Sequence, residues 1–254
     1  MALAPADAVA ELWKERIKER LSRVGEKAER KQSGKALMIN ERIAFKALTE
    51  AAFVDSEVVA EYLAGVLAAA PSDSDAGAPW IAQIGRLSSL QLRLHYVFYR
   101  AVWSYARENS ISPDPDGRLY YPELFFPASA LQATLEIDDP VESFAVLSAL
   151  KGLEHEGLLS EAQVIKAGAQ VSRSGSRSSR YYRPPEAGLV LKNKAYGIEL
   201  FLWGCGYSYH NPRLLTNIPE QLIEIEPPVP ACKGHNLIEF PHYNDRDRSR
   251  VDRD

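Results

Sequence analysis

The stretch DDPVESFAVLSALKGLEHEGLLSEAQVIKAGAQVSRSGSRSSRYYRPPEAGLVL, residues 138–191, decides the fold of this chain. Its opening Asp138-Asp139-Pro140 is typical of a helix start, because an Asp suits the cap and a Pro suits the first helical position. A helix is therefore predicted for residues 141–156, ended by Gly157. We expect one apolar face on this helix, formed by Phe144, Leu147, Leu150 and Leu153.

A long β-hairpin, called the wing below, is predicted to follow this helix. Residues 158–171 and 181–191 are expected to be extended, and residues 173–180 between them form a tip of Ser, Gly and Arg. We expect a mobile tip, because small polar residues contribute little to a core.

Helices are also predicted before the wing, and together with it they follow a known order of elements. A helix is predicted from Trp80 to Glu108 with a break near Leu87-Ser88-Ser89, and a short one over residues 128–135. Two helices joined by a turn and followed by a long hairpin give the winged-helix order, with Leu90 to Glu108 as the first helix. The near-helical spacing of its aromatic residues favours core packing over a cofactor site: Tyr96, Phe98, Tyr99, Trp103 and Tyr105.

The amino-terminal region is predicted to be helical throughout. Apolar residues recur every three or four positions between Ala6 and Gln32, which indicates one amphipathic helix. Its stripe comprises Val9, Trp13, Ile17, Leu21, Val24 and Ala28. Mixed charge on the remaining surface favours packing on protein rather than on lipid. Further helices are predicted over residues 41–54, capped by Asn40, and over residues 58–69.

The chain is therefore expected to be mainly α: a helical region at 1–79, a winged-helix-like domain with a β-hairpin wing at 80–206, and an irregular extension at 207–254. A helix over 196–203 should close the middle region. Short strands are predicted at 118–121 and 222–225, and the tail from Asn244 is expected to be disordered.

Three regions of the chain resemble the abortive infection alpha (Abi-alpha) family of bacterial proteins. They are ERIAFKALTEAAFVDSEVVAEYLAGVLAAA (41–70), WIAQIGRLSSLQLRLHYVFYRAV (80–102), and ALKGLEHEGLL (149–159) with GIELFLWGCG (197–206). The resemblance implies a role in anti-phage defence or a related stress response. It lends no catalytic residues, and it covers neither the wing tip nor the last fifty residues.

Composition excludes several classes of protein. The net charge of -4, from 30 basic and 34 acidic residues, gives no global field for nucleic acid. Two cysteines are too few for a disulfide framework and fit a reducing cytoplasm. No apolar run reaches the roughly 18 residues of a membrane span, and no secretory signal opens the chain.

The wing carries the most distinctive candidate binding residues, since no acid occurs between Ala162 and Pro185. Its basic and aromatic members are Lys166, Arg173, Arg177, Arg180, Tyr181, Tyr182 and Arg183. Arginines can track phosphates and a tyrosine can stack on an unpaired base. Against groove binding, the preceding helix region carries Glu142, Glu154 and Glu156 with Lys151 as its one lysine. The wing is therefore expected to be a solvated or protein-docking loop, with nucleic-acid contact as the alternative.

No catalytic motif is present, because the chain lacks a Gly-x-Ser-x-Gly elbow, a phosphate loop and a His-Glu-x-x-His pair. The metal-like set is Cys205, His210, Cys232, His235 and His242. Cys232-x2-His235 has a usable spacing but Cys205-x4-His210 is looser, which favours a buried Cys205 and surface histidines over a four-ligand zinc site. We therefore expect no cofactor and no metal. The sequence predicts a non-enzymatic cytoplasmic defence protein that binds another protein and could also form homo-oligomers. The alternatives are a nucleic-acid-binding winged-helix module and an enzyme whose dispersed site no motif reveals.

Overall fold

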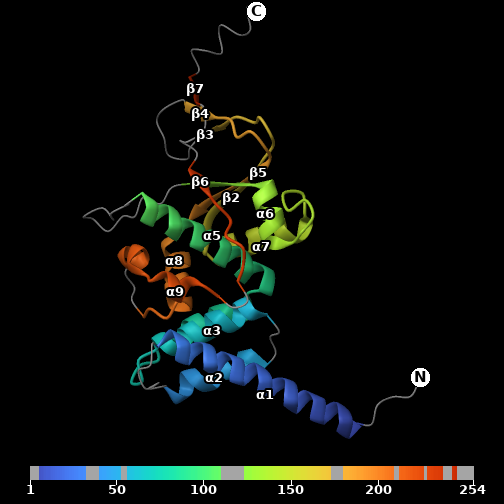
Figure 1. Ribbon diagram of the computed structural model, residues 1–254, viewed down its shortest axis with the longest axis vertical. Helices are drawn as coiled ribbons and strands as arrows, with labels where there is room; N and C mark the ends of the chain where they lie inside the picture. Colours follow the sequence, from blue (N-terminus) through green and yellow to red (C-terminus); the bar gives the residue numbers. More distant parts are fainter. Residues whose placement is uncertain are drawn as a thin grey trace, which may run out of the picture. The chain divides into compact units, whose positions relative to one another are not determined.

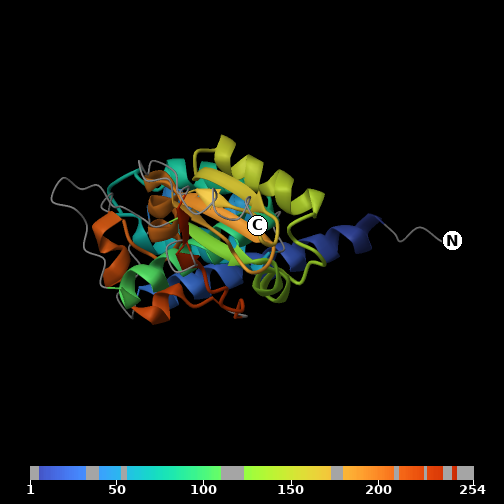
Figure 2. The same cartoon turned by 90° about the horizontal axis from the view of Figure 1, so that it is seen from above.

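The computed structural model describes residues 6–32, 40–52, 56–109, 123–172, 180–208, 212–225, 228–236 and 242–244 (Figures 1 and 2). The described chain is mainly helical and contains a small four-stranded antiparallel sheet. The predicted strand at 118–121, most of the wing tip and residues 245–254 lie outside it. The chain divides into two compact units, each built from two distant stretches. Unit 1 is Met1–Arg93 with Glu199–Pro228, and unit 2 is Leu94–Ile198 with Val229–Asp254.

Unit 1 is helical in its described part. Its elements are α1 (Ala6–Lys31), α2 (Glu41–Ala52), α3 (Glu57–Ala69), α4 (Ala78–Arg86), the start of α5 (Ser89–Glu108), the end of α8 (Ala195–Gly204), the 3-10 helix η1 (Pro212–Asn217) and α9 (Glu220–Ile223). The predicted helices at 6–32, 41–54 and 58–69 and the break near Leu87 are confirmed. The strand predicted at 222–225 is wrong, because Ile223 ends a one-turn helix in which the Glu224 N–H donates to Glu220 O.

Local capping begins α2 where the sequence predicted it. The Asn40 Oδ1 accepts hydrogen bonds from the Arg42 N–H (3.0 Å) and the Ile43 N–H (3.2 Å). These bonds satisfy two of the backbone donors that a helix leaves unpaired in its first turn. One face of α2, with Ile43 and Ala47 fully buried, then packs in unit 1.

Small residues let α3 and α8 approach each other closely. A Cβ atom on Gly65 of α3 would lie 2.0 Å from the backbone oxygen of Gly204, so only glycine fits there. On the other side of this contact a Cβ on Gly204 would meet the Tyr62 ring at 2.8 Å. Trp80 of α4 stacks near Trp203 of α8, with ring centroids 6.1 Å apart. The alanine- and glycine-rich α3 therefore acts as the packing centre of unit 1.

Unit 2 combines helices with two small sheets. Its elements are α5 from Leu94, β1 (Leu124–Pro127), α6 (Ala128–Leu135), α7 (Phe144–His155), β2 (Leu159–Ile165), β3 (Val171–Ser172), β4 (Arg180–Tyr182), β5 (Gly188–Asn193), the start of α8, β6 (His235–Asn236) and β7 (His242–Asn244). The first sheet has the order β2-β5-β1-β6 and the second β3-β4-β7. The helices predicted at 128–135 and 196–203 are confirmed.

The inner strands β1 and β5 of the four-stranded sheet are buried on both faces. Successive strand residues point to opposite faces, so the side chains of Phe125 and Phe126 of β1 lie on opposite faces of the sheet. Phe126 meets Phe98 of α5 edge to face, with ring centroids 5.6 Å apart, on the helical side. Phe125 joins a cluster with Val190 of β5 and Ile165 of β2 on the other side. The predicted core role of the α5 aromatics is thereby confirmed, with Tyr105 half-buried and accepting a 2.8 Å bond from Asn236 Nδ2.

The predicted hairpin is present, but each of its arms is divided between the two sheets. The inner halves β2 and β5 pair antiparallel in the first sheet, with Ile165 opposite Gly188. The outer halves β3 and β4 pair in the second sheet, where β7 adds a third strand against β4. Gly168 lies between β2 and β3 with φ +71°, a conformation that favours glycine.

The helix predicted over 141–156 begins three residues later, at Phe144, with Ser143 as its cap residue. Asp139 has φ +43°, which is incompatible with the extended backbone of a cap residue, so the predicted start signal is wrong. Residues 140–142 form a turn instead, in which the Ser143 N–H donates to Asp139 O (3.0 Å).

Candidate partner-binding site

One side of α7 is buried and the opposite side is open. Nine residues separate Phe144 from Leu153, which places them about 180° apart around the helix. Leu153 is fully buried, whereas Phe144 is 85% exposed, so the predicted common face of Phe144, Leu147, Leu150 and Leu153 is wrong. The core side instead comprises Val146, Ala149, Leu150 and Leu153. The open side, called the α7 face below, comprises Phe144, Ala145, Ser148, Lys151 and His155.

The carboxylates of the α7 region do not belong to the α7 face. Glu154 Oε1 accepts a 2.6 Å hydrogen bond from the Ala162 N–H of β2. Its Oε2 accepts another from Lys151 Nζ, also at 2.6 Å. Glu154 therefore covers a backbone donor of the edge strand β2, which has no further strand beyond it in the described sheet. Glu142 lies in the turn before α7 and half-buried Glu156 caps its end.

The α7 face is consequently apolar at one end and weakly charged at the other. The Lys151 ammonium is paired with Glu154, so it adds little net charge. Phe144 is the most exposed large hydrophobic side chain in the described part of the chain, at 85%. The chemistry of this surface suits an apolar protein contact better than the phosphates of a nucleic acid.

The predicted wing residues differ in their burial and in how far the structure describes them. Lys166 and Arg183 are exposed at the ends of β2 and β4. Tyr182 is 6% exposed and packs with Val171 and Val190, so its ring belongs to the core and cannot stack on a base. Arg180 and Tyr181 lie in β4, and their side chains fall outside the description. Arg173 and Arg177 lie outside the described residues altogether.

A cluster of charges joins α1 to α3 within unit 1. The Glu61 side chain is only 2% exposed and lies 2.7 Å from Lys27 Nζ, 2.8 Å from Arg30 Nη2 and 3.2 Å from Lys31 Nζ. Arg23 reaches Glu57 at 2.6 Å at the start of α3. Burial raises the pKa of Glu61, but Lys31 and Lys27 outweigh it, so the net pKa is lowered. Glu61 thus stays ionised and holds the two helices together.

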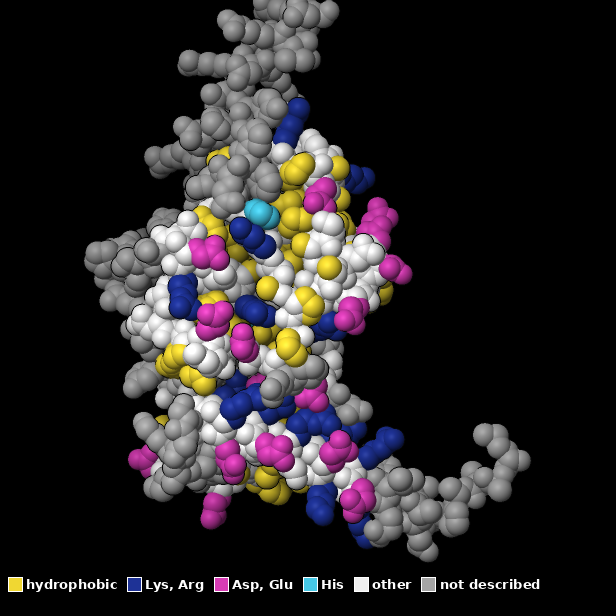
Figure 3. All heavy atoms as spheres, viewed as in Figure 1, with side chains coloured by type: hydrophobic (Ala, Val, Ile, Leu, Met, Phe, Trp, Pro, Cys, Tyr) yellow, Lys and Arg dark blue, Asp and Glu magenta, His cyan; other side chains and the backbone are white. Residues whose placement is uncertain are grey.

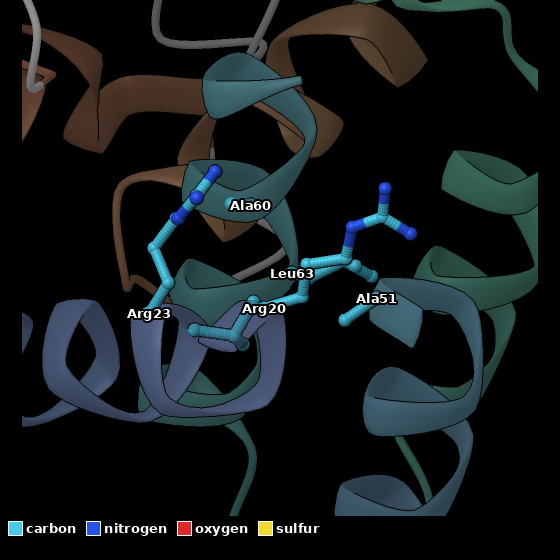
Figure 4. A pocket seen from close by; sticks show the side chains of 6 residues that line it. Arg20, Arg23, Ala51, Ala60 and Leu63 are labelled. Atoms are coloured by element: carbon cyan, nitrogen blue, oxygen red, sulfur yellow. The ribbon is translucent and has the colours of Figure 1, made fainter. Parts of the chain in front are cut away.

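The arginines ahead of this cluster line a small cleft between α1, α2 and α3 (Figure 4). Arg20 and Arg23 stand on either side of it, and its lining is otherwise apolar: Val24, Ala51, Ala60 and Leu63. The Arg20 Nη1 donates to the Ala52 carbonyl at 2.8 Å, which satisfies the end of α2. Both side chains therefore have structural roles in joining the three helices.

Two titratable groups in unit 2 are fully buried. His95 Nε2 is 3.0 Å from the Gly197 carbonyl, to which it donates, and burial lowers its pKa to about 3. The Tyr99 hydroxyl donates to Leu158 O at 2.5 Å, and burial raises its pKa. Their rings are in contact, with centroids 4.4 Å apart. His95 thus joins the first turn of α8 to α5, and Tyr99 joins the segment after α7 to the same helix.

The metal-like set of the sequence is only partly described. Cys205 and Cys232 are buried thiols, and burial raises their pKa values to about 12 and about 11. His235 is half-buried in β6, His210 lies outside the description, and of His242 only the backbone is described. Among the described residues, no three His, Cys, Asp or Glu side chains gather as metal ligands would.

Comparison with known proteins gives no match: no protein-family model, curated protein or solved structure corresponds to this chain. Within the described part of the chain, every helix is too short or too polar to cross a membrane.

Proposed function

We propose that this chain is a non-enzymatic, winged-helix-like adaptor that acts by binding another protein through the α7 face. The order α5, β1, α6, α7, β2, β5 and the strand arrangement β2-β5-β1 support the winged-helix interpretation. In that plan α7 takes the place of the exposed recognition helix. The observation that carries the proposal is the 85% exposure of Phe144 at the start of α7.

The setting we propose is cytoplasmic defence of a bacterium against phage, or a related stress response. The support for this is the resemblance of residues 41–70, 80–102, 149–159 and 197–206 to the Abi-alpha family. Two free, buried cysteines fit a reducing compartment. In this setting the α7 face would recognise a bacterial or phage protein.

Replacing Phe144 by Glu should abolish partner binding and leave the fold intact. Aromatic anchors at interfaces contribute about 2 kcal/mol or more, so affinity should fall at least about 30-fold. An exposed side chain adds little to stability, and the unfolding midpoint should stay close to that of the wild type. The measurement is affinity purification from infected and uninfected cells, followed by titration of the protein recovered.

Phe45 offers a matched control, because it is 73% exposed on α2 of unit 1. The variant Phe45→Glu adds the same charge to another helix and should retain the partner. Equal loss of the partner in both variants, or retention in both, would remove the α7 face from consideration. Turnover of nucleotides, nucleic acid or NAD by the purified wild type would remove the non-enzymatic proposal.

A second candidate function is nucleic-acid binding by the wing, which its run of basic residues favours. Replacing Arg173, Arg177, Arg180 and Arg183 together by Ala should then lower affinity for nucleic acid. Each lost phosphate contact should reduce the slope of log affinity against log salt by about 0.9 on duplex or 0.7 on single strands. Titration at two salt concentrations measures this slope. Weak binding that is the same in wild type and variant would eliminate the candidate.

A further inference from the structure

The edge of β2 that faces away from β5 is the outer edge of the four-stranded sheet, because the strand order in the described part of the chain is β2-β5-β1-β6. β2 pairs antiparallel with β5, with Ala162 opposite Leu191. The Ala162 N–H nevertheless donates to Glu154 Oε1 of α7, so it points away from β5. Backbone groups of an antiparallel ladder alternate in direction, and those of Val164 therefore point to the outer edge as well. This edge offers the donors and acceptors that a further strand requires.

A row of apolar side chains ends at this edge. Phe126 of β1 lies opposite Leu189 of β5, which lies opposite Val164 of β2, so the three side chains share one face of the sheet. Phe126 and Leu189 are fully buried, whereas Val164 is 44% exposed. Val164 is the last member of the row, and a further strand beside β2 would cover it.

The Glu154 carboxylate covers the same edge from α7. Its Oε1 accepts the Ala162 N–H at 2.6 Å, and its Oε2 accepts a hydrogen bond from Lys151 Nζ at 2.6 Å. The Glu154 side chain is only 19% exposed. A hydrogen bond to a carboxylate is stronger than one between neutral groups, so a strand that pairs with β2 has to displace a favourable contact. Glu154 therefore opposes the addition of a strand to β2.

We infer that β2 pairs antiparallel with β2 of a second copy of this chain, and that Glu154 limits this pairing in the wild type. The regular part of β2 follows the register shift at residues 159–161 and runs from 161 to 165. Reversed onto itself, this segment is centred on Gln163, and Ala162 of each copy meets Val164 of the other as a hydrogen-bonded pair. The small alanine leaves room for the exposed valine.

The side chains of β2 favour a second copy as the occupant. In this register the two Gln163 side chains, which are exposed and neutral, face each other. Glu161 lies opposite Ile165, so like charges are nowhere directly opposed within the segment. Phosphates fit the edge less well, because Glu154 and Glu161 lie beside it. On the face of the molecule that Figure 3 views, acidic and basic side chains are intermingled, which does not favour a polyanion either.

The test is the mass of the full-length protein in solution over a range of concentrations, by sedimentation equilibrium or light scattering. Glu154→Ala uncovers β2 and should form dimers at concentrations at least about tenfold below those that the wild type needs. Glu154→Gln retains an acceptor for the Ala162 N–H and should stay closer to the wild type. Glu142→Ala removes an exposed carboxylate from the turn before α7 and should match the wild type. Circular dichroism of each variant verifies that its helices persist.

Further changes within β2 test the pairing itself, each added to Glu154→Ala. Ala162→Pro removes the outward donor and should return the protein to one chain, because a proline at this position breaks hydrogen bonds only at the outer edge. Gln163→Glu and Gln163→Lys each place like charges opposite each other and should weaken the dimer several-fold. A mixture of these last two proteins places opposite charges across the centre and should restore a dimer with one chain of each. Sedimentation of the mixture and of each protein alone measures this exchange.

Three results would each overturn the inference. They are a mass that is the same in the wild type and in Glu154→Ala at every concentration, a dimer that survives Ala162→Pro, and a mixture that is no more dimeric than its components. None of these variants changes a residue of the α7 face, so the outcome is independent of Phe144 and of the partner proposed for it.

Discussion

Replacing Glu61 by Ala is expected to reduce the free energy of unfolding of unit 1 by about 3–5 kcal/mol. The carboxylate is the shared partner of Lys27, Arg30 and Lys31, and the two lysine side chains are 8% and 3% exposed. Removing it leaves two ammonium groups buried beside each other with too little negative charge to compensate them. The measurement is urea unfolding followed by circular dichroism, with amide hydrogen exchange in α3 as the local readout for unit 1.

Two further variants separate loss of charge balance from loss of packing. Adding Lys31→Met to Glu61→Leu removes one charge of each sign and fills the space with apolar groups, which should recover most of the lost stability. Glu26→Ala changes an exposed glutamate of the same helix α1 and should have an effect within about 0.5 kcal/mol. Equal, small effects of Glu61→Ala and Glu26→Ala would show that the cluster contributes nothing to stability.

The sequence contained signals for this cluster that helical periodicity alone did not resolve. Glu61 interrupts the apolar sequence of the helix predicted at 58–69, which the structure shows to be buried. Lys31 follows Val24 by seven residues and so lies on the apolar stripe of α1, where a solvated lysine does not belong. Glu61 and Lys31 carry opposite charges and pair in the structure, but predicting this pair requires knowing that α1 and α3 run side by side. That information is tertiary.

The apolar face of α7 was mispredicted for a related reason. Phe144 was grouped with Leu153 by spacing, although nine residues place two side chains on opposite sides of a helix. Helical spacing does not indicate which of two opposite sides will be buried, because that depends on tertiary packing, here of α7 against β2. The mainly helical class was predictable, whereas the exposed face of α7 was not.

In the wing, too, local features could be predicted from the sequence and tertiary contacts could not. Its two arms and its turn residues were visible in the sequence, because extended segments and glycine are local features. Its division into two sheets was not visible, since β7 joins β4 from more than fifty residues away. Tyr182 was assigned to a binding surface on the strength of its basic neighbours. Its burial with Phe125 and Ile165 depends on the first sheet, which those neighbours do not specify.

Acidification is expected to destabilise unit 2 through His95. The imidazole is fully buried and neutral, and its pKa of about 3 lies below the ordinary value of 6.5 that the unfolded chain restores. Between these values the unfolded state binds a proton that the folded state does not, so stability falls as the pH falls from about 6.5 towards 3. The slope is about 1.4 kcal/mol per pH unit, or about 2 kcal/mol between pH 6.5 and pH 5.

The Glu61 carboxylate loses its contribution to stability at a lower pH than His95 does, so the two effects can be separated by pH. Glu61 has a pKa below its ordinary value of 4.5, so its contribution persists above that value and is lost only as the pH falls through its folded pKa. A loss of stability between pH 6.5 and pH 5 therefore belongs to histidine.

The variant His95→Gln tests this assignment, since an amide can still donate to the Gly197 carbonyl, 3.0 Å from Nε2 in the wild type, and does not titrate. It should be less stable than the wild type at pH 7, because the ring contact with Tyr99 is lost. It should also lose most of the pH dependence between pH 6.5 and pH 5. Urea unfolding at pH 7 and pH 5, with hydrogen exchange of the α5 amides as the local readout, measures both effects. His155→Gln makes the same substitution at an exposed position of α7 and serves as the matched control. A slope that survives in His95→Gln would mean that another group carries the acid sensitivity of this unit.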